Sequence, residues 1–365
     1  MKTILFGLLA MAALLQSCTL GRSFRYNAAS IRDYKIFASR PLYASDKPFR
    51  FINASGKGIL TDSISYGGHV QHLDKFMEDH NTVAFLVIRN DSMLYEKYYN
   101  HYNRESYVAS FSMAKSFTSA LIGAAIADGF IKSVKDPVTD YIPELLGKGF
   151  EAVTLEHILK MTSGLKFKES YWSPFGKAAV YYYTEDLRKQ IGKLKLKHYP
   201  GTTFDYKSGN TQLLGLVLER ATHKTVTQYM QEKVWEPIGM EYDANWSLDR
   251  KDTGLEKTFC CLNARALDFA KFGRLYLNKG NWNGKQVLPA AYITESVKVD
   301  TTVGSVPYYQ YQWWLPNPGD GSFCAVGILG QYIFVDPSQN LIIVRLGKNQ
   351  GGVNWLKVLQ AYKLT

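Results

Sequence analysis

The chain has 365 residues, of which 46% are hydrophobic and 14% aromatic, so it can form a large packed core and is not globally disordered. Its formal net charge of +11 favours anionic neighbours such as nucleic acid, an acidic membrane surface or an acidic polymer. The basic residues are scattered, however, without a recognition-helix pattern, a Cys/His finger or an aromatic–basic RNA signature. We therefore expect no nucleic-acid partner. The sequence also contains no metal-ligand cluster or phosphate-cradling loop, so we expect no metal and no cofactor.

The first residues have the pattern of a secretory signal. Lys2 is followed by an apolar run, Ile4 to Leu15, which is too short for an ordinary membrane span. The segment Leu15 to Cys18 (LQSC) resembles a bacterial lipobox, in which the cysteine becomes the lipidated first residue. We expect residues 1–17 to be a signal peptide and Cys18 to carry a lipid anchor in the bacterial envelope, on the periplasmic face of a membrane. A signal without lipidation is the alternative.

The segments that follow predict a tether, a hairpin and a long helix. Residues 18–60 are polar and irregular, and we expect a tether that begins to pack onto the domain. An apolar run at 82–89, a turn at 90–92 and a mixed run at 93–99 predict a β-hairpin. Residues 112–128 are rich in Ala, Ser and Leu and predict a helix that is buried on several sides and ends at Gly129.

Helical patterns dominate the middle of the chain and strands return near its end. Residues 131–255 carry Pro, helical patterns and loops, and residues 265–278 predict another amphipathic helix. Strand-like runs occupy 310–315, 322–326, 332–336 and 341–346, and a terminal helix follows Gly352. The chain therefore predicts an α+β fold. Residues 61–130 and 256–365 form a sheet subdomain in this prediction, and residues 131–255 form a helical inserted subdomain.

The spacing Ser-x-x-Lys occurs at Ser112 and Lys115, where the predicted helix begins. Residues three apart are neighbours on a helix, so the lysine amine can reach the serine hydroxyl and take its proton. Burial helps, because it disfavours the charged form of lysine. The same spacing recurs at Ser163 and Lys166, but Ser163 opens no apolar helix. The helix context therefore favours Ser112 as the nucleophile, whereas the motif by itself fits a helix-capping serine beside a surface lysine.

Several segments in this order resemble the serine β-lactamase and penicillin-binding-protein superfamily, in its class C-like branch. That branch includes D,D-peptidases, esterases and nylon-oligomer hydrolases. The resemblance covers about residues 75–350 and rests on Ser110–Ser116 (SFSMAKS), Thr154–Leu165, Pro200–Asn210 (PGTTFDYKSGN), Leu267–Gly273 and Gly327–Gln331 (GILGQ). It implies a β-lactamase-like fold, an antiparallel sheet flanked by helices, and an acyl-enzyme mechanism with Ser112 and Lys115 as catalytic residues.

The same resemblance implies further site residues. Tyr206 matches the family's catalytic tyrosine, which relays a proton if neighbouring cations keep its pKa low. Ser208 stands where the family usually has Asn, and Asn210 is a candidate to supply the missing amide. The family's third motif, Lys-Thr-Gly or a variant, corresponds to the stretch from Gly327 through Ile328 to Gly330, which carries no cation. We expect its glycines to admit the substrate backbone and the Ile328 N–H to be an oxyanion donor.

The absent Lys-Thr-Gly cation bears on the substrate. A carboxylate that leaves water needs a charged or multiply donating partner, so we expect weak or absent β-lactam hydrolysis. The nearby aromatic residues Trp313, Trp314 and Trp172 favour a neutral or aromatic acyl group. Arg345, on a neighbouring strand, is an alternative source of the cation.

Four cysteines occur, without a CxxC spacing. We expect Cys260 and Cys261 to point to opposite faces of a strand as small buried residues, rather than to form a disulfide with Cys324.

The sequence thus predicts an envelope-attached serine hydrolase of the esterase/amidase or D-peptidase type, with a small-molecule or peptide ester or amide as substrate. The alternative is a non-catalytic envelope or peptide-binding protein on the same fold.

Overall fold

The computed structural model describes residues 19–26, 28–54, 62–171, 173 and 175–361. The predicted signal peptide at residues 1–17 and the predicted lipidation site Cys18 lie outside these described residues. Among the residues described, no helix is both long and apolar enough to cross a membrane.

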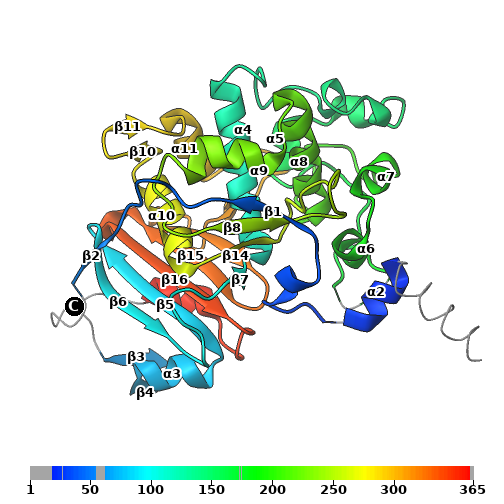
Figure 1. Cartoon of the computed structure of the whole chain (residues 1–365). Helices are drawn as coiled ribbons and strands as arrows, with labels where there is room; N and C mark the ends of the chain where they lie inside the picture. Colours follow the sequence, from blue (N-terminus) through cyan, green and yellow to red (C-terminus); the bar gives the residue numbers. More distant parts are fainter. Residues whose placement is uncertain (1–18, 27, 55–61, 172, 174, 362–365) are drawn as a thin grey trace, which may run out of the picture.

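An eight-stranded sheet forms the centre of the fold, and its strands come from both ends of the chain (Figure 1). Neighbouring strands are antiparallel, except that β2 and β6 pair in parallel. This arrangement confirms the predicted α+β class. In order across the sheet, the strands are β12 (Tyr309–Gln310), β13 (Trp313–Trp314), β14 (Phe323–Gly327), β15 (Gln331–Asp336), β16 (Leu341–Gly347), β5 (Thr82–Arg89), β6 (Ser92–Tyr98) and β2 (Ile52–Asn53).

Helices cover both faces of this sheet, which explains why its central strands are apolar. Every residue of β16 is buried, as expected for a strand packed on two sides. One face carries α10 (Ala266–Leu277), where a Cβ on Gly273 would lie 2.9 Å from Ile342, so glycine lets the helix sit close to the sheet. The other face is covered by α3 (Leu73–Asp79) and α12 (Trp355–Ala361) through a separate apolar cluster.

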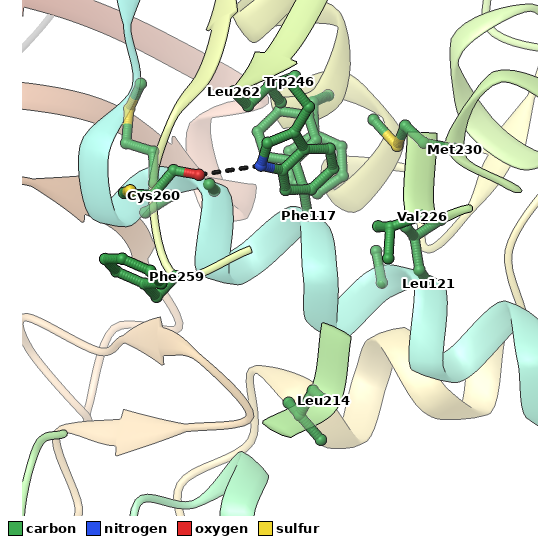
Figure 2. Close-up of a cluster of buried hydrophobic side chains, with 14 of the residues drawn as sticks. Phe117, Leu121, Leu214, Val226, Met230, Trp246, Phe259, Cys260 and Leu262 are labelled. Carbon is green, nitrogen blue, oxygen red and sulfur yellow. Dashed lines mark hydrogen bonds between the residues drawn. The ribbon is translucent and has the colours of Figure 1, made fainter. Parts of the chain in front are cut away.

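The predicted buried helix is α4 (Ala114–Ala127), preceded by the 3₁₀ turn η2 (Phe111–Met113). Every residue from Ala114 to Ala125 is buried, and the Phe117 ring stacks on Phe272 of α10 with the ring centroids 3.6 Å apart. Figure 2 shows Phe117 and Leu121 in the cluster that joins this helix to its neighbours. The other α-helices of the described residues are α2 (Thr19–Tyr26), α5 (Leu155–Leu159), α6 (Lys177–Tyr183), α7 (Leu187–Gly192), α8 (Ser208–Thr222), α9 (Val226–Met230) and α11 (Ala290–Ser296).

A second sheet, which the sequence did not predict, has the order β1-β8-β9-β7. It brings β1 (Ser39–Leu42), from the segment predicted as a tether, against β8 (Ala244–Ser247), from the region predicted as helical. Both strands are short, and β1 contains Pro41, which is tolerated because β1 is an edge strand. The remaining strands are β7 (Val108–Ala109), β9 (Leu262–Ala264) and the hairpins β3 (Ser63–Tyr66) with β4 (His69–His72) and β10 (Asn281–Trp282) with β11 (Lys285–Gln286).

Candidate active site

Ser112 lies on a sharp turn between β7 and α4. The residue before it, Phe111, has φ +45°, a left-handed conformation that side chains larger than glycine rarely adopt. Such backbone strain costs about 1–3 kcal/mol and tends to occur at functional sites. Phe111 and Met113 are buried, whereas Ser112 is half-buried and lines a cleft. The strained turn therefore presents the serine hydroxyl to the cleft at the beginning of a buried helix.

The Lys115 amine lies within hydrogen-bond distance of that hydroxyl. Its Nζ lies 2.8 Å from Ser112 Oγ and donates to the Phe259 carbonyl at 2.7 Å. The side chain is almost fully buried, and burial lowers the pKa of Lys115 to about 7, with only a partial opposing effect of the Glu169 carboxylate. A substantial fraction of the amine is then neutral at neutral pH and able to accept the serine proton.

Tyr206 approaches the same pair from the loop before α8. Its hydroxyl shares a hydrogen bond with Ser112, and Lys115 Nζ lies 5.2 Å from the centroid of its ring. Burial raises the pKa of Tyr206, and the bond to Ser112 only partly offsets this rise. The expectation that cations keep this pKa low is therefore wrong. Tyr206 remains a neutral phenol at neutral pH and can pass a proton only by giving one and taking one together.

A carboxylate that the sequence analysis missed organises the first turn of α8. Glu169 accepts from the Ser208 backbone N–H at 2.8 Å and from Ser208 Oγ at 2.6 Å, and the Tyr171 hydroxyl also donates to it. A negative group at a helix N-terminus is stabilising, so Glu169 fixes Ser208 beside the cleft. Glu169 and Tyr171 belong to no motif, and the only signal was their position in an aromatic-rich segment after Leu165.

Asn210 does not supply the amide that the sequence analysis assigned to it. Its Oδ1 accepts from Ser163 Oγ and its Nδ2 donates to Met161 Sδ at 3.3 Å, so both ends of the amide are engaged inside the core. The prediction failed because Asn210, two residues into α8, is fully buried between packed segments. The same contact explains the second Ser-x-x-Lys: Ser163 is buried against Asn210, whereas Lys166 is exposed.

Three residues predicted to contact the substrate, Gly327, Ile328 and Gly330, have different roles in the structure. Gly327 ends β14, and a Cβ there would lie 2.3 Å from the Ser110 carbonyl, so glycine admits the turn that carries the nucleophile rather than the substrate. Ile328 lines the cleft together with Ser112, as expected for the strand that edges the site. Gly330 has φ +82°, its carbonyl accepts from Arg345 at 2.7 Å, and a side chain there would collide with that guanidinium. Its predicted contact with substrate is therefore wrong.

Arg345 does not provide the missing cation. Its guanidinium lies 4.0 Å from the centroid of the Trp355 ring, in the cluster on the far face of the sheet. Its nitrogens also donate to the carbonyls of Gly330 and His80.

Among the described residues, apolar and aromatic side chains line most of the cleft, together with two serines and no charged side chain. Its residues are Ala29, Phe111, Ser112, Tyr171, Ala179, Tyr182, Tyr183, Ser208, Phe259, Cys260 and Ile328. Of the predicted tryptophans, Trp314 packs on Tyr206 with ring centroids 5.6 Å apart, Trp313 is buried against Phe272, and Trp172 lies outside the described residues. In the part of the chain that the structure describes, no three His, Cys, Asp or Glu side chains gather as a metal site would require.

The cysteine prediction was wrong for one pair. Cys260 and Cys261 form a disulfide with each other, although we expected reduced side chains on opposite faces of a strand. The strand β9 begins only at Leu262, and Cys261 has φ +71°, so the two residues lie on a turn rather than in extended backbone. Cys324 is free and buried, which confirms that it takes no part in a disulfide.

Comparison with known proteins agrees with this geometry. A relative named 6-aminohexanoate-dimer hydrolase, from Paenarthrobacter ureafaciens, is 26% identical over 294 residues, which cover 75% of this chain and 74% of the relative. The solved structure of a Bacillus anthracis protein assigned as a 6-aminohexanoate-dimer hydrolase has a TM-score of 0.81 and 26% identity, with 92% of each chain covered.

A third similarity shows the fold alone. The structure of EstCE1, a hydrolase with promiscuous acyltransferase activity, has a TM-score of 0.62 at 14% identity and covers 78% of this chain and 94% of that one. The family model for Beta-lactamase matches residues 70–355, which is more than half of the sequence. With a Ser–Lys pair at the expected place in the fold, the chain belongs to the beta-lactamase family of hydrolases.

Proposed function

We propose that the protein is a serine hydrolase that cleaves neutral esters or amides through an acyl-enzyme on Ser112. The observation that carries this proposal is the distance of 2.8 Å between Lys115 Nζ and Ser112 Oγ, in a site where burial lowers the pKa of the lysine to about 7. A serine hydroxyl needs such a base to become a nucleophile.

The residues around the cleft allow the steps of acyl transfer to be assigned. Neutral Lys115 accepts the Ser112 proton while Oγ attacks the substrate carbonyl, and the N-terminus of α4 with the Ile328 N–H stabilises the oxyanion. The Tyr206 hydroxyl, bonded to Ser112, passes a proton to the leaving alcohol or amine as the carbonyl re-forms. Water then attacks the acyl-enzyme, and the same groups act in reverse to release the acid.

The cleft favours a substrate without a negative charge. No cation stands where Lys-Thr-Gly relatives have one, and the described lining is mostly apolar and aromatic. A substrate carboxylate would lose its water there without gaining a charged partner, whereas an aliphatic or aromatic acyl chain would gain from burial. The names of the two relatives, 6-aminohexanoate-dimer hydrolase, support a linear amide as one probe, and the carboxylate of such a dimer is blocked so that the probe carries no negative charge.

We expect a large preference for esters and linear amides over β-lactams. The measurement compares kcat/KM for nitrocefin with kcat/KM for a short-chain p-nitrophenyl ester and for a 6-aminohexanoate dimer whose carboxylate is blocked as an amide, with the Ser112→Ala variant as the blank. Burial of the nitrocefin carboxylate without a charged partner should make kcat/KM for the neutral ester about 100-fold or more higher. Nitrocefin turnover equal to or faster than ester turnover would refute the argument from the missing cation.

The proposal also includes attachment of the protein to the bacterial envelope through a lipid on Cys18. The lipobox-like segment ends at Cys18, and the next residues form α2, which packs on α6. Arg22 of α2 bonds Glu185 at 2.6 Å, and the Tyr26 ring stacks on Tyr183, a residue that lines the cleft. A lipid on Cys18 would therefore hold this wall of the cleft close to the membrane surface.

The Cys18→Ser variant is expected to leave the membrane fraction or to stop at the unprocessed precursor, because the anchor and its processing both need the thiol. Fractionation of cells, followed by mass determination of the N-terminal peptide, measures both outcomes. The Cys324→Ala variant is the matched control and should stay with the membrane. If Cys18→Ser is cleaved normally and remains membrane-bound, the anchor lies elsewhere.

A further inference from the structure

The base Lys115 is held by a turn, residues 257–261, that we call the lysine turn. All five of its carbonyls accept hydrogen bonds, so its backbone is fixed along its whole length. Lys115 donates to Phe259 at 2.7 Å, and Trp246 Nε1 donates to Cys260 at 2.9 Å (Figure 2). The Lys257 carbonyl accepts from Trp246 Nε1 and from the Cys260 N–H, and the Thr258 carbonyl accepts from the Thr118 hydroxyl. The Cys261 carbonyl accepts from Asn263 Nδ2 and from the Ser247 N–H.

The disulfide between Cys260 and Cys261 closes the end of this turn. Two adjacent cysteines joined in this way form a small ring that restricts the backbone between them. Within it Cys261 adopts φ +71°, which a free non-glycine residue avoids at a cost of about 1–2 kcal/mol. The ring therefore favours a backbone conformation that the same residues would tend to leave as separate thiols.

The disulfide also adjoins the cleft. Cys260 lines the cleft with Ser112 and Phe259, although each cysteine of the pair is only 3–4% exposed. The Phe259 ring centroid lies 5.9 Å from Lys115 Nζ, so the turn screens the amine from water as well as accepting its hydrogen bond. A change at Cys260 would thus reach the base through one residue.

Building on the proposed function, we propose that the Cys260–Cys261 disulfide positions Lys115 by fixing the Phe259 carbonyl, and that its reduction lowers turnover reversibly. A dithiol reductant breaks the S–S bond by supplying two electrons and two protons. It leaves two thiols on the protein and becomes a disulfide itself. The pair are positioning residues, since they touch the base only through Phe259.

The consequence for Lys115 has a definite direction. A relaxed turn admits water to the amine and weakens the burial that keeps it neutral, so a higher pH is needed to form the base. The acidic limb of the pH profile of kcat/KM should therefore shift to higher pH in the reduced protein. Each unit of movement lowers the rate below the limb about tenfold. A purely structural role of the disulfide would lower stability without moving this limb.

The test uses the full chain with Cys324→Ala, which removes the buried free thiol on the other side of the sheet. Ester hydrolysis is followed from pH 5 to 10 before and after treatment with a dithiol, and again after reoxidation. Alkylation of the peptide that contains residues 260–261 counts its thiols at each stage. We expect no labelled thiol before reduction and two after it. The acidic limb should shift to higher pH on reduction, with about a tenfold loss of kcat/KM at pH 7, and reoxidation should restore the original profile.

Two double variants keep the test decisive if the buried bond resists the reductant. Cys260→Ala/Cys261→Gly permits φ +71° without a ring, and Cys260→Ala/Cys261→Ala opposes it. We expect the limb to shift in both and more strongly in the alanine pair. The inference would be overturned if two thiols were labelled before reduction. It would also be overturned if the limb did not shift in either variant or in the reduced protein, or if near-ultraviolet circular dichroism were lost together with activity. Failure of a fluorophosphonate to label Ser112 in the oxidised protein would instead overturn the proposed function.

Discussion

Replacement of Ser112 with alanine is expected to abolish covalent labelling by a fluorophosphonate and to lower ester turnover on the order of 10⁴-fold or more. The reason is that Ser112 Oγ is the nucleophile in the assigned mechanism, at 2.8 Å from Lys115 Nζ. The fold should persist, because the side chain is half-buried and its removal leaves no large cavity. Labelling with mass detection, turnover and thermal unfolding are measured on the same preparation.

Ser163→Ala is the matched control for this variant. Ser163 has the same Ser-x-x-Lys spacing but donates its hydroxyl to Asn210 in the core. Its loss should lower the free energy of unfolding by about 1–3 kcal/mol, because Asn210 is left without a buried donor, and labelling of Ser112 should be unchanged. The assignment of the nucleophile is wrong if Ser112→Ala retains wild-type turnover, or if the Ser163→Ala variant is no longer labelled by the fluorophosphonate at Ser112. An absence of labelling in the wild type would favour the non-catalytic binding protein.

Features that depend on local pattern could be read from the sequence. The hairpin of β5 and β6 follows an apolar run and a turn, and α4 begins where Ser-x-x-Lys opens a stretch of small and apolar residues. The resemblance to the serine β-lactamase superfamily then implied that Tyr206 shares a site with Ser112 and Lys115, and the structure brings these three together. For the hairpin, the helix and the Ser–Lys pair, the information lies in residues that are close in sequence.

Features that depend on long-range packing could not be read. Glu169 reaches Ser208 across 39 positions of sequence, and no periodicity connects the two. Gly330 looks like a glycine that admits substrate, but the group against it is Arg345 from another strand. The ring between Cys260 and Cys261 depends on the chain turning before β9, and adjacent cysteines give no sign of where a strand begins.

Lys115→Met is expected to lower kcat/KM about 10²–10⁴-fold, because the serine then lacks its base while the volume of the side chain is nearly kept. In the wild type, kcat/KM should rise with pH through about 7 and then level off, since burial lowers the pKa of Lys115 to about 7 and only the neutral amine accepts a proton. The variant should lose this limb from its residual activity. A wild-type profile that is flat between pH 5 and 9 would contradict the role of Lys115 as the base.

The same substitution is expected to stabilise the fold, which separates a catalytic role from a structural one. The pKa of Lys115 falls from an ordinary value of 10.5 to about 7 on folding, so the unfolded chain binds the extra proton between these two values. The contribution of this group to the free energy of unfolding therefore decreases as pH falls from 10.5 to 7. Below pH 7 the full free-energy cost of burying the protonated amine remains. Lys115→Met removes the penalty but leaves the Phe259 carbonyl without its donor. We therefore expect a net gain of about 2 kcal/mol in the free energy of unfolding at pH 6. Urea unfolding at pH 6, 8 and 9.5 should show this gain shrinking as pH rises, and a variant less stable than the wild type at pH 6 would mean that the buried amine stabilises the fold.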